Sequence, residues 1–136
     1  MATNIFVNLP VQDLDKSKAF FGALGYTFNA QFTNDNGACM EIDEHIYCMF
    51  LPEPFFARFT PKAITDAHQQ TECTTCLSVE TRERVDEWAE TALVLGATEN
   101  QVPDMQQGDT MYGRSLNDLD GHIWEILWMD PQVIQE

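Results

Sequence analysis

Hydrophobic and polar positions alternate from residue 5 to residue 11, as in a strand with one buried face. Apolar residues then recur at helical spacing between Asp13, which is suited to cap a helix, and Gly25, which is suited to end it. Three more strands are predicted at residues 26–28, 38–42 and 45–51. The first half of the chain therefore predicts the order strand, helix and three strands.

The second half repeats this order. A strand at residues 74–79 precedes a helix that Thr81 caps and Gly96 ends, and strands follow at residues 97–100, 111–116 and 122–129. The phrase HIWEIL at residues 122–127 echoes HIYCMF, 77 positions earlier, and LSV at residues 77–79 echoes LPV, 68 positions earlier. An internal repeat of this kind indicates an α+β fold of two tandem βαβββ modules.

We expect one domain with module one at about residues 1–52, a connecting segment at 53–71, module two at about 72–130 and a short tail at 131–136. The connecting segment contains Phe55, Phe56 and Phe59. Two interpretations stay open for it: a linker that its phenylalanines hold against the core, or a lid over a pocket. Residues 61–66 could form one helical turn.

Charge restricts the partners. The 136 residues carry a net charge of −15 without a basic stripe, so nucleic acid and anionic membranes are poor partners. No apolar run is long enough for a membrane-spanning helix, and the first residues lack the pattern of a secretory signal. We therefore expect a cytoplasmic protein with its four cysteines as free thiols.

Two other groups of possible ligands have weak support. Cys73 and Cys76 form a C-x-x-C, but residues three apart on a strand point to opposite faces, which disfavours a zinc or redox site. The histidines at positions 45, 68 and 122 are expected at the surface, since nothing in the sequence brings two of them together.

The phrases VNLPVQDL at residues 7–14 and DLDGHIWE at residues 118–125 occur in an order that resembles the vicinal oxygen chelate superfamily. This superfamily includes glyoxalase I, the bleomycin-resistance proteins and the extradiol dioxygenases. The resemblance implies two curved mixed sheets around a cavity, and a homodimer. In catalytic members each half supplies two ligands, usually His or Glu, to one divalent metal.

The same resemblance places the four metal positions. They are Glu125, four residues after the Gly of the Asp-Gly turn, Phe6, seven residues before Asp13, and their counterparts in the repeat, Cys48 and Thr74. Only Glu125 has the expected chemistry, whereas a catalytic metal needs about three protein ligands. We therefore expect no metal and no other cofactor.

Strand alternation predicts which side chains face the cavity. If residues 118–121 form a four-residue turn, Arg114 lies opposite Glu125, either as its ion-pair partner or as a binding group for an anionic ligand. The predicted ligand-binding residues are Phe6, Asn8, Cys48, Phe50, Thr74, Tyr112, Arg114 and Glu125.

The favoured function is the metal-free binding of a small, partly apolar molecule. The alternative is a lyase, isomerase or dioxygenase in which Glu125 and Cys48 hold a divalent metal such as Ni, Zn, Mn or Fe. Glu125 would then be the catalytic residue, as a ligand or a general base. A purely structural or interaction domain is a third possibility, which the cavity lining disfavours.

Overall fold

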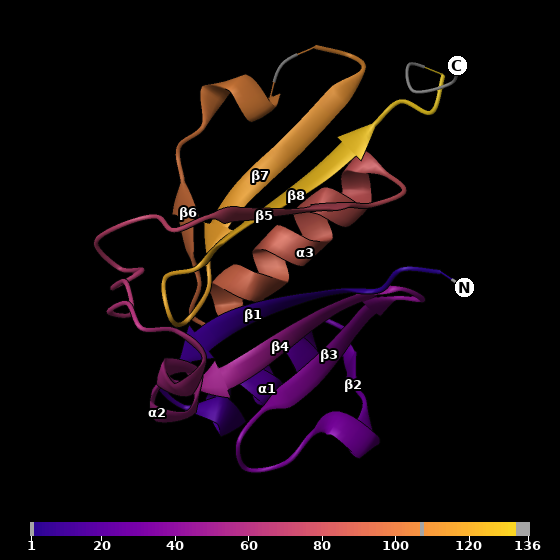
Figure 1. Cartoon of the computed structure of the whole chain (residues 1–136). Helices are drawn as coiled ribbons and strands as arrows, with labels where there is room; N and C mark the ends of the chain where they lie inside the picture. The colour runs from indigo at the N-terminus through magenta and orange to yellow at the C-terminus, as the bar shows by residue number, and fades with distance from the viewer. Residues whose placement is uncertain (1, 107, 133–136) are drawn as a thin grey trace. The chain divides into compact units, whose positions relative to one another are not determined.

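A computed structural model describes residues 2–106 and 108–132. The chain divides into two compact units, Met1–Thr65 and Asp66–Glu136, and each contains one four-stranded mixed sheet (Figure 1). The predicted α+β fold of two tandem βαβββ modules is confirmed. Most of the tail expected at residues 131–136 lies outside the described residues.

In the first unit the strand order is β1-β4-β3-β2, and β1 pairs with β4 in parallel. The strands are β1 (Ile5–Val11), β2 (Thr27–Phe28), β3 (Ala38–Asp43) and β4 (Ile46–Pro52). Helix α1 (Leu14–Ala23) begins where the Asp13 side chain accepts a hydrogen bond from the Lys16 amide. Its Phe21 ring stacks on Phe50 of β4 at 4.8 Å, so α1 covers one face of the sheet.

Short helices lie at two places in this unit, between β2 and β3 and after β4. The 3₁₀ helix η1 (Ala30–Phe32) precedes β3, and α2 (Glu53–Phe56) continues into η2 (Ala57–Phe59) directly after β4. The prediction of a helical turn at residues 61–66 is wrong, because those residues have no regular structure. Pro54 in the first turn of α2 favours a helix start there, because its ring fixes φ at a helical value.

The second unit has the equivalent order β5-β8-β7-β6, with β5 parallel to β8. Its strands are β5 (Thr74–Ser78), β6 (Thr98–Asn100), β7 (Met111–Asn117) and β8 (Ile123–Met129). Helix α3 (Arg82–Val94), capped by Thr81, packs along β7 and β8 (Figure 1). A 3₁₀ helix, η3 (Pro103–Gln106), precedes β7.

Each sheet thus has a helix face, which α1 or α3 covers, and a helix-free face. Leu9 and Val11 are buried on the helix face of the first sheet, while Phe6 and Asn8 alternate onto its helix-free face. In the second sheet Trp124 and Ile126 are buried on the helix face, and Glu125 lies on the helix-free face. These orientations match the sequence prediction for Phe6, Asn8 and Glu125.

Among the residues that the structure describes, every helix is too short or too polar to cross a membrane.

Candidate functional site

The centre of the second helix-free face is a row of partners across three strands. Glu125 of β8 has Cys76 of β5 as its parallel Cα partner and Ser115 of β7 as its antiparallel one. Thr74 shares this face, because it lies two residues before Cys76 on β5 and side chains two apart on a strand point to the same side. Cys76 is exposed, but partial desolvation of its sulfur by the surrounding sheet, and secondly the charge of Glu125, raise the pKa of its thiol. The thiol is therefore predominantly protonated at neutral pH, which makes it a weak nucleophile and a weak metal ligand.

The equivalent position in the first sheet is Met49, not Cys48. Asn8 corresponds to Cys76. The two residues are 68 positions apart in the sequence, as are the two helix caps, Asp13 and Thr81. The parallel partner of Asn8 is Met49, so Met49 corresponds to Glu125 and the repeat offset at the last strand is 76 rather than 77.

This shift reverses the expected orientation of Cys48 and Phe50. Both side chains have 0% exposure and lie on the helix face, where their partners are Val7 and Leu9. The prediction that they line the same surface as Phe6 and Asn8 is wrong, because a register change of one residue moves a side chain through the sheet.

The metal positions implied by the fold family do not fit a divalent cation. On the first helix-free face the candidates are Phe6, which cannot ligate, and Met49, a soft thioether. On the second face Glu125 has only the neutral Thr74 hydroxyl and the protonated Cys76 thiol nearby on β5. Within residues 2–106 and 108–132 there is no group of three or more His, Cys, Asp and Glu side chains arranged to hold a metal.

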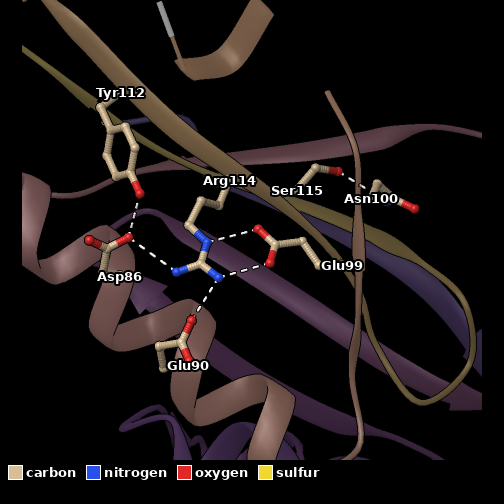
Figure 2. A network of polar contacts seen from close by, with 7 residues as sticks. All are labelled: Asp86, Glu90, Glu99, Asn100, Tyr112, Arg114 and Ser115. Carbon is tan, nitrogen blue, oxygen red and sulfur yellow. Dashed lines mark hydrogen bonds and ion pairs between the residues drawn. The ribbon is translucent and has the colours of Figure 1, made fainter. Parts of the chain in front are cut away.

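Arg114 also lies on the opposite side of its sheet from Glu125. Its Cα partner is Ile126, and its guanidinium binds both carboxylate oxygens of Glu99 at 2.8 Å (Figure 2). Asp86 and Glu90 of α3 complete the site at 3.1 and 2.7 Å. The prediction that Arg114 pairs with Glu125 is wrong.

Tyr112 belongs to the same helix-face network, so its expected place on the helix-free face is also wrong. Its hydroxyl donates to Asp86 (Figure 2), and burial together with this carboxylate raises the pKa of the phenol. The hydrogen bond with Arg114 lowers the pKa of Glu99, against the effect of its burial, and the pKa of Arg114 is raised in return. Arg114 thus has three carboxylate partners and stabilises the attachment of α3 to the sheet.

The hairpin turn between β7 and β8 is the physical reason that Arg114 and Tyr112 lie on the helix face. It contains five residues, since Asn117 pairs with Ile123 and the Asp118 amide donates to the His122 carbonyl at 2.9 Å. Inside the turn the buried Asp118 carboxylate accepts hydrogen bonds from three N–H groups, those of Asp120, His122 and the Trp124 indole. These hydrogen bonds fix a turn one residue longer than the Asp-Leu-Asp-Gly phrase suggests.

His122 is buried rather than exposed, contrary to the sequence prediction. Its side chain has 4% exposure and its Nδ1 lies 2.8 Å from the Glu72 carboxylate. This contact attaches the segment before β5 to the start of β8. The signal for it in the sequence is the position of His122 beside an Asp-Gly turn, which does not identify the distant partner.

The edge of the second helix-free face carries neutral polar side chains. The amides of Asn100 and Asn117 donate to each other at 3.0 and 2.8 Å, and they also donate to Ser115 and Thr98 (Figure 2 shows the Asn100–Ser115 contact). They border a cavity of about 380 Å³ whose other wall is residues 67–71. The four hydrogen bonds use all the amide hydrogens of the two asparagines, and every side chain in this group is uncharged.

A larger cavity, of about 510 Å³, lies within the first unit. It extends from the helix-free face of the sheet to the helices α2 and η2. Its lining residues are Asn8, Met49, Leu51, Phe55, Phe56 and Phe59. Asn8 and the phenylalanine-rich segment are among the residues that the sequence indicates, whereas Met49 and Leu51 are not, because the sequence predicts the wrong register for β4.

The connecting segment therefore forms a wall of this cavity. None of the residues in α2 and η2 is buried, although Phe55 packs edge-to-face on Phe59 at 5.2 Å. Of the two interpretations of this segment, a structure over a pocket agrees better with these positions than a linker fixed in the core.

The comparisons with known proteins agree with this architecture. Residues 3–43 match the family model described as "Bleomycin resistance protein-like N-terminal". A hypothetical protein from S. aureus is 29% identical, with a TM-score of 0.78 over 94% of this chain and 95% of that one. The resemblance to the vicinal oxygen chelate superfamily is confirmed.

Two further solved structures are similar in fold. A glyoxalase/bleomycin resistance protein/dioxygenase family enzyme from Burkholderia phytofirmans is 18% identical, with a TM-score of 0.75 over 94% of this chain and 99% of that one. The fosfomycin resistance protein FosX from Listeria monocytogenes, complexed with Mn(II) and sulfate ion, is 17% identical, with a TM-score of 0.69 over 97% of this chain and 94% of that one. No curated protein matches the sequence.

Proposed function

We propose that this protein binds a small, partly apolar molecule and that the cavity of its first unit holds the apolar part. The observation that carries the proposal is the lining of that cavity: three phenylalanines, Met49 and Leu51, with Asn8 as the polar group. A volume of about 510 Å³ is in the range of small-molecule sites, which are mostly apolar with a few polar groups that fix orientation.

The lining favours a ligand with an aromatic ring. Phe55, Phe56 and Phe59 come from consecutive turns of α2 and η2, so their rings approach the cavity from one side. Offset and edge-to-face ring contacts add roughly 0.5–1.5 kcal/mol each to the burial of apolar area. Met49 on the opposite wall is unbranched and polarisable, and it adapts to flat ring surfaces.

The other predicted ligand-binding residues on the helix-free faces remain part of the proposal. Phe6 stacks on Tyr47 at 4.8 Å beside Asn8, which extends the aromatic surface along β1 and β4. Thr74 and Glu125 are proposed separately, as polar ligand-binding residues on the helix-free face of the second unit's own sheet. Cys48, Phe50, Tyr112 and Arg114 are not included, since they face the helices.

A thermal-shift screen of aromatic and heteroaromatic compounds tests the proposal. We expect compounds that raise the melting temperature of the wild-type protein. For Phe56→Ala, at least tenfold more compound should be needed for the same rise in melting temperature. Phe32→Ala is the matched control, because Phe32 is 55% exposed in the same unit and does not line the cavity. Equal responses of the two variants would place binding elsewhere.

The metalloenzyme alternative has a separate test. The protein is incubated with Ni²⁺, Zn²⁺ and Mn²⁺, freed of excess metal by gel filtration and analysed for bound metal. We expect far less than one equivalent per chain. About one equivalent, lost in Glu125→Ala, would favour the alternative in which Glu125 is a ligand or a general base.

We propose further that the protein is a cytoplasmic homodimer. The free state of all four cysteines supports a reducing compartment, and the superfamily resemblance supports the dimer. Light scattering on the purified protein, and fractionation of cells that express it, test these two points separately.

A further inference from the structure

Among the described residues that line the cavity of the first unit, Asn8 alone has a polar side chain. It lies on the helix-free face of β1, beside Met49 of β4, its parallel Cα partner. A single polar group in an apolar site determines which polar group of a ligand is accepted, because an unmatched polar atom loses its hydrogen bonds to water on binding.

The side chain of Asn8 has unused hydrogen-bonding capacity of both kinds. One amide hydrogen points to the Phe6 carbonyl at 3.4 Å, a long contact. Within the described residues, neither the second amide hydrogen nor the Oδ1 oxygen has a protein partner. A carboxamide therefore offers one donor and one acceptor side by side, and it does so whichever way the amide is turned.

Charge complementarity excludes an anion as the best match. None of the six lining residues is charged, and the chain as a whole has a net charge of −15. Arg58 of η2, next to the lining phenylalanines in the chain, lies over the Phe55 ring, with its guanidinium carbon 5.3 Å from the ring centroid. An anionic group would lose hydration in the cavity without gaining an ion pair from a lining residue.

From these positions we infer that the ligand is a planar aromatic molecule with a neutral amide-type edge, such as a primary carboxamide, lactam or imide. The ring lies between Met49 and the phenylalanines, and the edge exchanges two hydrogen bonds with Asn8. This inference rests on the proposed function, because it names the class of ligand for the same cavity.

The test uses three probes with one ring system: 2-naphthamide, 2-naphthoate and N,N-dimethyl-2-naphthamide. We expect the wild-type protein to bind 2-naphthamide about tenfold or more tightly than either of the others, which corresponds to about 1.4 kcal/mol. Asn8→Leu removes both hydrogen-bonding groups at similar volume, so its affinity for 2-naphthamide should fall about tenfold. Its affinity for the dimethyl amide should fall clearly less, because that probe can exchange only one hydrogen bond with Asn8, through its carbonyl oxygen. Asn8 is exposed, so the variant is expected to fold, and circular dichroism checks this.

The outcomes separate this inference from the proposed function. Equal binding of all three probes, dependent on Phe56, would leave the proposed function standing and overturn the amide preference. Tightest binding of 2-naphthoate, lost in Arg58→Met, would show that the site selects anions and would also overturn it. If none of the three probes binds, both the inference and the proposed function are contradicted.

Discussion

Cys76 of β5 and Glu125 of β8 are Cα partners in adjacent parallel strands, and both side chains lie on the helix-free face of the second sheet. This pairing puts the carboxylate where it opposes ionisation of the thiol. Burial and the charge of Glu125 together raise the pKa of Cys76. The pair therefore places a thiol of raised pKa beside a carboxyl side chain.

Replacement of Glu125 by Gln should make Cys76 more reactive. Loss of the negative charge lowers the pKa of the thiol, so more thiolate is present at pH 8 and alkylation by iodoacetamide is faster. The rate is measured by mass spectrometry in a Cys73→Ser background, because Cys73 is also exposed. Glu99→Gln, which removes a carboxylate from the helix face, should leave the rate unchanged; equal rates in all three proteins would contradict the assigned pairing.

Arg114→Met should destabilise the protein by about 2–4 kcal/mol, since it leaves three carboxylates close together without their cation. The Arg114 side chain is only 12% exposed, whereas the ion pair of Arg84 with Glu87 is at the surface. Arg84→Met is therefore the matched control, with an expected loss below about 1 kcal/mol. Urea denaturation measures both, and similar losses would show that the network around Arg114 contributes no more than a surface pair.

Glu99 should make the protein less stable in acid. Its folded-state pKa is lowered below 4.5, first by the hydrogen bond with Arg114, so its contribution is fully present above the unfolded-state pKa and is lost as the pH falls through the folded-state value. Between pH 5 and pH 3 the free energy of unfolding should therefore fall more steeply in the wild type than in Glu99→Gln.

Asp118 acts in the opposite direction, because burial raises its pKa, and its contribution is lost as the pH rises. Since Asp118 is present in both proteins, its effect cancels in the comparison with Glu99→Gln. Parallel curves for the two proteins from pH 7 to pH 3 would show that Glu99 does not titrate with a lowered pKa.

Gly121→Ala should cost clearly more stability than Gly25→Ala. Both glycines have positive φ, but a Cβ on Gly121 would lie 2.7 Å from the backbone carbon of Ala67, while a Cβ on Gly25 meets no atom within 4 Å. Positive φ alone costs an alanine about 1–2 kcal/mol, so we expect that loss for Gly25→Ala and at least about 2–3 kcal/mol for Gly121→Ala. Equal melting temperatures would mean that residues 67–68 can move away from the turn without loss.

Much of the fold follows from local features of the sequence. Asp13 and Thr81 cap the two helices as predicted, and Gly25 and Gly96 follow the helices with positive φ. Caps, glycines and the spacing of apolar residues act within a few positions, so they can be recognised without knowledge of distant contacts. The phenylalanine-rich segment after β4 could also be singled out, but not its helices or the cavity beside it.

The sequence by itself determined the two βαβββ modules and the position of Glu125 on a helix-free face, because these depend on periodicity within single elements. Only the tertiary structure decided that Met49 rather than Cys48 corresponds to Glu125, and that Arg114 binds Glu99, Asp86 and Glu90. Both depend on strand register. In the first unit the pairing of β1 with β4 sets the register, and in the second unit one extra residue in the turn that Asp118 stabilises is enough to move Arg114 to the helix face. Since side chains alternate with a period of two, one position separates a residue in the core from a residue on the helix-free face.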